Sequence, residues 1–306
     1  METLAAVLVS VIGAATPLVF AAVGELVAEK SGVLNLGVEG MMLIGAVAAF
    51  AAALTTGSAT LGILAGAGAG AILALIFALL TLTLLANQVA TGLALTIFGV
   101  GVSALIGRSF VGIPLQRLQQ LDLPGLSDLP IVGTLLFGHD ILVYLSILLI
   151  PATIWFLDRS RAGLILRSIG ENHAAAHALG HPVIAVRYLA VMFGGAMAGL
   201  GGAYLSLAYT PMWAENMTAG RGWIALALVV FATWRPGRLL LGAYLFGGIT
   251  VAQLHVQGFG FDVPSQFLSM LPYVATIGVL VAISADGARA RLNAPGSLGR
   301  IFHPDA

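Results

Sequence analysis

One acidic residue, Glu39, stands near the beginning of a long apolar stretch, where a carboxylate is costly to bury and usually has a function. Three nearby glycines, Gly32, Gly37 and Gly40, permit an irregular backbone or a close approach of helices. Asn35 lies four residues before Glu39, so we expect both side chains to share one helical face. Two interpretations stay open. Either Asn35 and Glu39 line or brace a polar path, or Glu39 is a structural carboxylate that is hydrogen-bonded to a neighbouring helix.

Uncharged polar residues stand at the ends of two further apolar stretches. Asn87 and Gln88 open one of them, and Gln253 and His255 lie late in another. Each of these side chains either faces a path or satisfies backbone groups at a helix end, and the second alternative is the more common one. The residues predicted to line a path are Asn35, Glu39, Asn87 and Gln88.

Three histidines, His173, His177 and His181, recur at every fourth residue. A pair with this spacing can bind zinc. Here no acidic third ligand is in register, and Pro182 ends the helix, so we expect a solvated helix face and no metal site. The sequence also lacks the phosphate-binding loop G-x-x-x-x-G-K-[ST], the nucleophile elbow G-x-S-x-G and the zinc motif H-E-x-x-H. We therefore expect no catalytic residues and no cofactor bound by this chain.

The composition identifies the elements that must position these residues. Hydrophobic residues make up 59% of the chain, charged residues only 8%, and the mean hydropathy is +1.02. Soluble domains carry about 25% charged residues, so this is an integral membrane protein. A formal net charge of zero argues against a nucleic-acid partner, and the absence of cysteine excludes disulfides and thiolate metal sites.

A membrane span needs about 20 mostly apolar residues. On that basis we expect an all-α, polytopic helical bundle of about eight to ten spans that forms a single membrane domain over residues 1–306. The predicted spans are Leu4–Val23, Val33–Leu54, Leu61–Leu85, Val89–Ile106, Ile141–Leu157, Tyr188–Tyr209, Trp223–Trp234, Leu239–Val256 and Phe267–Ala285. The Trp223–Trp234 segment is too short to cross alone. It is either a half-helix that enters from one face or the end of a span that begins near Met217.

The long polar interval Asp158–Arg187 lies between two of these spans. Its alanine-rich middle, Ser168–Leu179, predicts one short helix, which Gly180 and Pro182 then end. A short, capped helix held between two spans is typical of a docking element for a soluble partner.

Basic residues concentrate on the cytoplasmic side of a membrane protein. Placing residues 158–187 inside leaves only Arg108, Arg117 and Arg221, of the 13 Lys and Arg residues, outside. Because the chain changes sides at each span, nine spans place the N-terminus outside, residues 286–306 in a cytoplasmic tail and residues 108–140 in an outer segment. That outer segment, which contains LDLPGLSDLP, is either an ordered or re-entrant loop or a simple connector.

Three blocks of sequence resemble a known family. They are GELVAEKSGVLNLGVEGMM (residues 24–42), SIGEN (residues 168–172) through Gly180, and MTAGRGWIALA (residues 217–227). They are similar to blocks in the permease subunits of nucleoside and simple-sugar ABC importers, within the broader group of ribose and branched-chain amino acid permeases. The blocks are spread over most of the chain.

The resemblance implies a permease subunit in a bacterial cytoplasmic (inner) membrane. The permease would pair with a second one, either a different sister subunit or a copy of itself. Partner ATPase subunits would use ATP and Mg²⁺, and a solute-binding protein would deliver a nucleoside or simple sugar. The residues it implies for coupling to the ATPase are Arg167, Glu171, Asn172, Ala175, Leu179 and Gly180. The alternative function, an ion-coupled secondary transporter, needs carboxylates within the spans, and only Glu39 clearly qualifies.

Overall fold

The computed structural model describes residues 2–121, 133, 135, 137–258 and 293–303, and eight separate residues between 267 and 281. Side chains of residues 2–4 and 256–258 are not described. The α-helices are α1 Glu2–Lys30, α2 Val38–Thr56, α3 Ala59–Ala78, α4 Gln88–Gly107, α6 Ile141–Arg159, α7 Arg161–Glu171, α8 His173–Ala178, α9 Val183–Tyr204, α10 Arg221–Phe231 and α11 Pro236–Gly258. Short π-helical turns, Leu79–Thr83 and Leu205–Tyr209, extend α3 and α9.

Seven of these helices are long and apolar enough to cross a membrane, which confirms the polytopic helical bundle. They are α1, α2, α3, α4, α6, α9 and α11. The 11-residue helix α10 reaches only ~16 Å, about half of a ~30 Å hydrocarbon core. Turns and bends precede it from residue 210 to residue 220, so it is a half-helix and not the end of a span beginning near Met217. Most of the predicted span Phe267–Ala285 lies outside the described residues.

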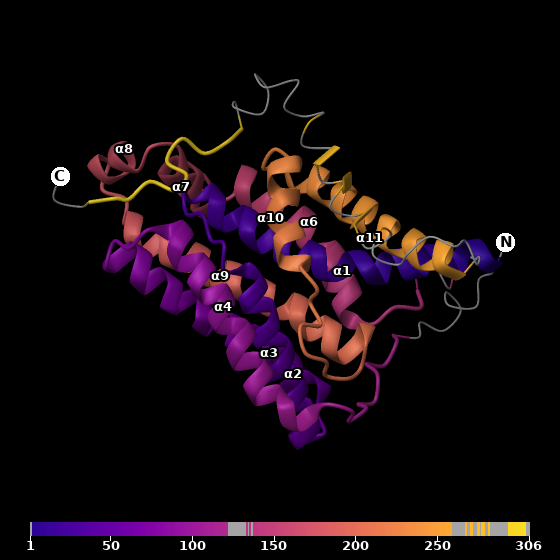
Figure 1. The fold of residues 1–306 in the computed structure, drawn as a ribbon. Helices are drawn as coiled ribbons and strands as arrows, with labels where there is room; N and C mark the ends of the chain where they lie inside the picture. Colours follow the sequence, from indigo (N-terminus) through magenta and orange to yellow (C-terminus); the bar gives the residue numbers. More distant parts are fainter. Residues whose placement is uncertain are drawn as a thin grey trace.

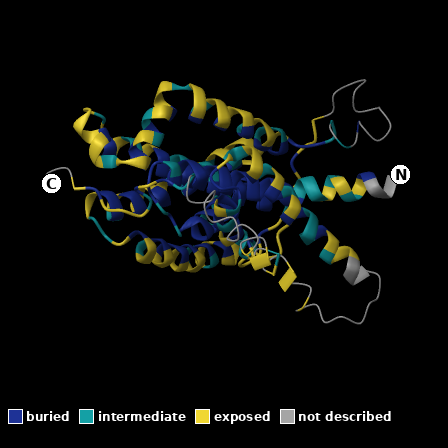
Figure 2. Cartoon of the chain, turned by 90° about the horizontal axis from the view of Figure 1, so that it is seen from above, coloured by how far each residue is buried: buried dark blue, intermediate teal, exposed yellow. Residues whose placement is uncertain are grey.

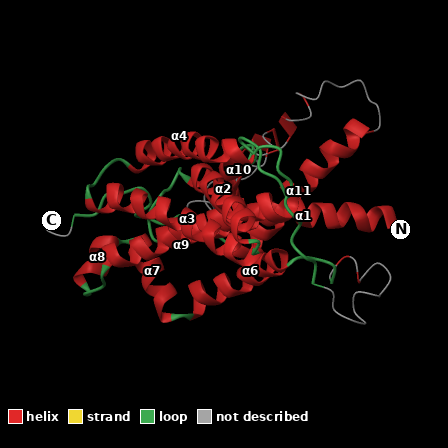
Figure 3. Ribbon diagram, turned by 90° about the horizontal axis from the view of Figure 1, so that it is seen from below, coloured by secondary structure: helices red, strands yellow, loops and turns green. Residues whose placement is uncertain are grey.

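Helices α1 and α9 form the centre of the bundle. Helix α9 packs against α1, α2 and α3, while α1 also packs against α6, α10 and α11. Figure 2 shows the buried residues concentrated along this centre and the exposed ones on the outer helix faces. Helices α7 and α8 and residues 293–303 lie at one end of the bundle, which we call the α7–α8 end (Figure 1). Helix α1 begins at the opposite end (Figure 3).

Small residues allow the central helices to approach closely. A Cβ atom added at Gly199 of α9 would lie 2.2 Å from the carbonyl oxygen of Gly66 on α3. One added at Gly45 of α2 would lie 2.4 Å from the Cα atom of Gly199. Such backbone contacts are typical of helix association in membranes, because van der Waals packing takes the place of the hydrophobic effect there.

Two predicted boundaries are wrong because the helices run further than the apolar stretches. Helix α1 continues past Val23 to Lys30 and therefore carries Glu25 and Glu29. Helix α9 begins at Val183 rather than at residue 188 and therefore includes Arg187. Each of these polar side chains forms at least one hydrogen bond with another part of the chain, so the helices extend through residues that apolarity alone excludes.

The outer segment is described only as far as residue 121 and again near residue 140. Its first part contacts the chain that leads to α10, through isolated bridges between Val111 and Trp213 and between Pro114 and Met212. Nearly all of the proline-rich sequence LDLPGLSDLP lies outside the described residues, so the choice between an ordered loop and a connector stays open.

Candidate functional site

The loop 31–37 between α1 and α2 positions Asn35. The Asn35 amide N–H donates to Oε1 of Glu25 at 3.0 Å, and its side-chain oxygen accepts from the Gly37 amide at 2.9 Å. Asn35 is buried, but it precedes the helix, which begins at Val38. The expectation that Asn35 and Glu39 share one helical face is therefore wrong. An asparagine side chain readily bonds to the backbone two residues on, and this turn displaces the helical turn.

The Glu39 carboxylate accepts three hydrogen bonds from the chain that enters α10. The Thr218 hydroxyl donates to Oε1 at 2.6 Å, and the Gly220 amide donates to the same oxygen at 2.8 Å. The Gly222 amide donates to Oε2 at 2.6 Å. Both carboxylate oxygens are thus occupied, and only 4% of the Glu39 residue surface is exposed.

This contact places a helix N-terminus inside the bundle. The first amides of a helix have no intrahelical acceptor and carry a partial positive charge, which a carboxylate stabilises. Gly220 adopts a left-handed conformation with φ of +82°, which turns the chain into α10. Gly40, next to Glu39, contacts Gly99 near the middle of α4. The N-terminus of α10 therefore lies deep among the spans, as do the half-helix termini at transporter sites.

The other two predicted path residues lie elsewhere. Buried Gln88 accepts a hydrogen bond from the Leu34 amide at 2.9 Å, and exposed Asn87 caps α4 by accepting from the Ala90 amide at 3.0 Å. Both side chains satisfy backbone groups at the end of a helix or loop. Neither side chain is among the described hydrogen-bond partners of Glu39, which are Thr218, Gly220 and Gly222.

Two further carboxylates, Glu25 and Glu29, belong to this region, and neither was among the predicted site residues. Glu29 accepts a hydrogen bond from the indole N–H of Trp234, which lies just after the end of α10. One oxygen of Glu25 bonds the loop amide described above, and the other has no hydrogen-bond partner among the described residues. The spacing of four residues, with no proline between, could have predicted both on one face of a longer α1. Carboxylates from α1 and α2 thus hold α10 at both ends.

The polar interval at the α7–α8 end forms two helices rather than the single predicted helix Ser168–Leu179. The break occurs at Asn172, whose backbone is extended, with φ of −150° and ψ of 97°. Its side-chain oxygen accepts from the Ala175 amide at 3.0 Å and so caps α8. Asparagine is a strong N-cap and a weak interior helix residue, so it begins a new helix here. Gly180, with φ of +84°, then ends α8 as predicted.

The residues predicted to couple to an ATPase lie on the outer surface of this end. Leu179 is 78% exposed, and Arg167 forms an ion pair with Asp158 at 2.8 Å. Both partners of that pair are well exposed, so it contributes little to stability. The exposed members of the predicted set are Glu171, Asn172, Ala175, Leu179 and Gly180.

Residues 293–303 pack beneath these helices. The Ser297 amide donates to the Gly170 carbonyl at 2.8 Å, and the Phe302 ring lies against His173 and His177, with ring centroids 5.2 and 5.3 Å apart. The expected solvated histidine face is therefore partly wrong, because two of its histidines contact this C-terminal segment. The aromatic partner is far away in sequence, so helical spacing could not reveal it.

Arg187 connects this segment to the rest of the bundle. Its buried guanidinium donates to the Ser31 carbonyl at 3.1 Å and to the Arg300 carbonyl at 3.4 Å, and it lies 3.1 Å from Nδ1 of His173. Burial lowers the pKa of His173, and the positive charges of Arg187 and Arg300 lower it further. One side chain thus joins the loop after α1, the C-terminal segment and α8.

Comparison with known proteins identifies a matching family and several similar proteins. The family model of the branched-chain amino acid transport system permease component matches residues 7–280. A putative glucose ABC transporter permease protein of Haloferax volcanii is 40% identical, over 99% of each chain. A nucleoside ABC transporter permease protein of Lactococcus lactis is 33% identical, over 94% of this chain and 97% of the relative. A guanosine ABC transporter permease protein of Bacillus subtilis is 32% identical, over 93% and 92%.

The matched region includes every membrane-spanning helix described here, the half-helix α10 and the α7–α8 segment. This multi-pass membrane protein belongs to the family of permease components of the branched-chain amino acid transport system type.

Proposed function

We propose that this ABC importer permease carries a nucleoside or a simple sugar. The proposal is supported by the names of three relatives, which refer to glucose, nucleosides and guanosine. These solutes share a ring that bears several hydroxyl groups. The chain is a transport subunit and not itself an enzyme, because the permeases of this family work with a separate ATPase and a substrate-binding partner.

The packing of the α7–α8 end supports the proposed mechanism. Residues 293–303 and Arg187 hold the inner side of α8, while Ala175 and Leu179 on its other side are exposed. A helix that is fixed on one side and free on the other suits the transfer of motion from a soluble partner. We assign the docking of the ATPase, which binds the ATP and Mg²⁺, to Arg167 and to residues 171–180.

For the path, we propose a brace rather than a lining role for Glu39. A lining carboxylate needs an oxygen that a solute can reach, but Glu39 is only 4% exposed and both of its oxygens accept hydrogen bonds from the chain. Asn35, Asn87 and Gln88 likewise bond to nearby backbone groups. These side chains would shape the path by fixing the loop 31–37 and α10, and the surface facing a second permease would supply the contacts with the solute.

We further propose that the whole chain is one domain in a bacterial cytoplasmic (inner) membrane, with the α7–α8 end inside. It would pair with a different sister permease, and a pair of identical chains is the alternative. The ion-coupled alternative is set aside, because ABC permeases are driven by ATP hydrolysis.

The test is a binding screen of the solute-binding protein encoded beside this permease. We expect titration calorimetry to detect tight binding of a nucleoside or a simple sugar. We also expect the same solute to stimulate ATP hydrolysis by the complete transporter in proteoliposomes. Binding of leucine, isoleucine or valine, with no response to sugars or nucleosides, would contradict the proposed substrate class. Purification of the complex would show whether one or two kinds of permease are present.

A further inference from the structure

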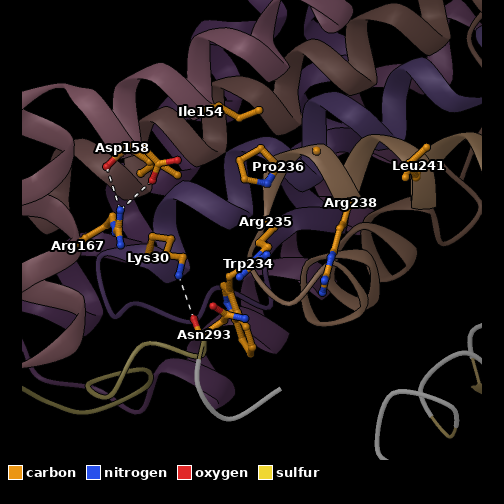
Figure 4. Close-up of a pocket in the computed structure, with 12 residues that line it drawn as sticks. Lys30, Ile154, Asp158, Arg167, Trp234, Arg235, Pro236, Arg238, Leu241 and Asn293 are labelled. Atoms are coloured by element: carbon orange, nitrogen blue, oxygen red, sulfur yellow. Dashed lines mark hydrogen bonds and ion pairs between the residues drawn. The ribbon is translucent and has the colours of Figure 1, made fainter. Parts of the chain in front are cut away.

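A cavity of about 520 Å³ opens at the α7–α8 end, between the ends of α1 and α6, helix α7 and the turn that joins α10 to α11. Four of the 13 basic residues of the chain line it, namely Lys30, Arg167, Arg235 and Arg238. Figure 4 shows Lys30 and Arg167 on one side of the cavity and Arg238 on the other.

The charge of the cavity is strongly unbalanced. Asp158 is the only acidic residue among the described residues that line it, and this carboxylate is already paired with Arg167. Within the described lining, four cations face one carboxylate, and Glu171, outside the lining, also attracts Lys30. Among the described residues, the side chain of Arg235 is exposed and has no hydrogen bond or ion pair. Such a surface is electrostatically complementary to an anion.

Other contacts of the chain hold the surrounding cations in place. The Lys30 ammonium donates to the Asn293 carbonyl at 2.9 Å, and the Arg238 guanidinium donates to the Thr233 hydroxyl at 2.9 Å. A guanidinium has five N–H donors, so this single bond leaves others for a ligand. Helix α11 also begins here, and the amides of Gly237 and Arg238 belong to its first turn, where an anion is favoured.

Two apolar residues of the lining face outward. Ile154 of α6 is 38% exposed and Leu241 of α11 is 71% exposed, and both line the cavity. Each lies about one helical turn further into its span than the charged residues, Asp158 and Arg238. Basic groups at the end of the spans, with an apolar rim one turn deeper, match the division of a phospholipid into headgroup and acyl chain.

We propose that this cavity is a binding site for a phosphate group, coordinated by Lys30, Arg235, Arg238 and the first turn of α11. The apolar rim favours the headgroup of an anionic phospholipid as the source of that phosphate, and soluble phosphate is the alternative source. Because Arg167 of α7 lines the same cavity, the bound ligand joins α7 to the α10–α11 turn. The site is separate from the Glu39 contact and does not depend on the identity of the transported solute.

The experiment uses the full-length chain, purified in mild detergent with the subunits that assemble with it. The pocket variant is Arg235→Gln with Arg238→Gln. The matched control is Arg159→Gln with Arg161→Gln, which removes the same charge from exposed positions at the same end but outside the cavity. Because Arg238 also bonds within its turn, Arg235→Gln alone serves as a second variant that leaves all described contacts intact.

Thermal melting and native mass spectrometry are measured after addition of phosphatidylglycerol, phosphatidylcholine or inorganic phosphate. We expect phosphatidylglycerol to protect the wild type more than phosphatidylcholine does, and its apparent affinity to fall about tenfold in the pocket variant, with a smaller loss in Arg235→Gln. The control should bind like the wild type. Equal protection by inorganic phosphate, lost in the same variants, would support the site with a soluble ligand. Equal losses in the pocket variant and the control, or no response to either anion, would overturn the proposal.

Discussion

Helix α10 and helix α8 are both short helices, but their surroundings differ. The N-terminus of α10 is enclosed within the bundle, and a carboxylate from α1 or α2 bonds to the chain at each of its ends. Helix α8 lies at the end of the bundle, with one side on the C-terminal segment and the other exposed. Buried hydrogen bonds therefore fix α10 within the membrane region, while packing on one side only leaves the other side of α8 exposed. Substitutions should therefore affect stability strongly near α10 and weakly at α8.

The largest loss of stability is expected for Glu39→Gln. The amide group keeps the size of the side chain but puts an NH₂ group where a carboxylate oxygen accepts from buried donors. A buried donor without its partner costs about 1–3 kcal/mol, so we expect a loss of about 3 kcal/mol in the free energy of unfolding. The control is Glu215→Gln, at an exposed position in the chain that leads to α10.

Thermal melting in mild detergent, beside uptake kinetics, checks this prediction. A Glu39→Gln protein that melts like the wild type but transports with altered apparent affinity would show that Glu39 lines the path and does not brace it.

A somewhat smaller loss is expected for Gly99→Ala in α4. The added Cβ atom would lie 2.5 Å from the Cα atom of Gly40, so α2 and α4 must move apart. Overpacking of this kind typically costs about 1–3 kcal/mol, and we expect a loss of about 2 kcal/mol here. Gly101→Ala is the matched control, because it lies in the same helix and its Cβ atom would meet open space. If both variants melt at the same temperature, the close approach beside Glu39 is not important for stability.

At the α7–α8 end, Phe302→Ala should loosen only the C-terminal segment. Phe302 is 8% exposed and contacts His173 and His177, so its removal should cost about 1–2 kcal/mol of local stability. We expect faster hydrogen exchange in residues 293–303 and no change in the melting of the bundle. Ile301→Ala, at a residue that is 40% exposed, is the control. A drop in the melting temperature of the whole protein would show that this end is part of the core.

The smallest effect concerns pH. The pKa of His173 is lowered by burial and by two arginines, so folding favours its neutral form. The stability that the neutral ring contributes is fully present above the unfolded pKa of about 6.5 and is lost as the pH falls through the lower, folded pKa. We expect hydrogen exchange in residues 293–303, corrected for its intrinsic pH dependence, to be faster at pH 5.5 than at pH 7.5. His173→Gln should abolish this difference, and His181→Gln should keep it.

Apolar stretches in the sequence predicted most of the fold. They identified the seven long helices and the short α10, because a span in lipid must satisfy its backbone groups internally and be apolar outside. They failed where polar residues continue a helix, as at Glu25 and Arg187, because the partners of those residues are distant in sequence.

The candidate site was predicted only in part. The cost of a carboxylate at membrane depth singled out Glu39. Its hydrogen-bond donors, in the chain that enters α10, could not be predicted, because they are more than 170 residues away in sequence. The sequence predicted one helix over Ser168–Leu179, where the structure has the end of α7 and all of α8. The break at Asn172 was not predicted, because helix propensity favoured a continuous helix. The capping bond from the Ala175 amide forms only when the Asn172 backbone is extended, which the residue types do not determine.

Substrate-stimulated ATP hydrolysis by the complete transporter with Ala175→Trp tests the docking role of α8 directly. Ala175 is exposed on α8, so the indole ring fits without disturbing the described fold, but it would occupy the proposed contact with the ATPase. Ala152→Trp, at an exposed position on α6, is the control. We predict that Ala175→Trp inserts and melts like the wild type but loses stimulation by substrate, while the control retains it. Normal stimulated hydrolysis in Ala175→Trp would contradict the assignment of α8 as the docking element.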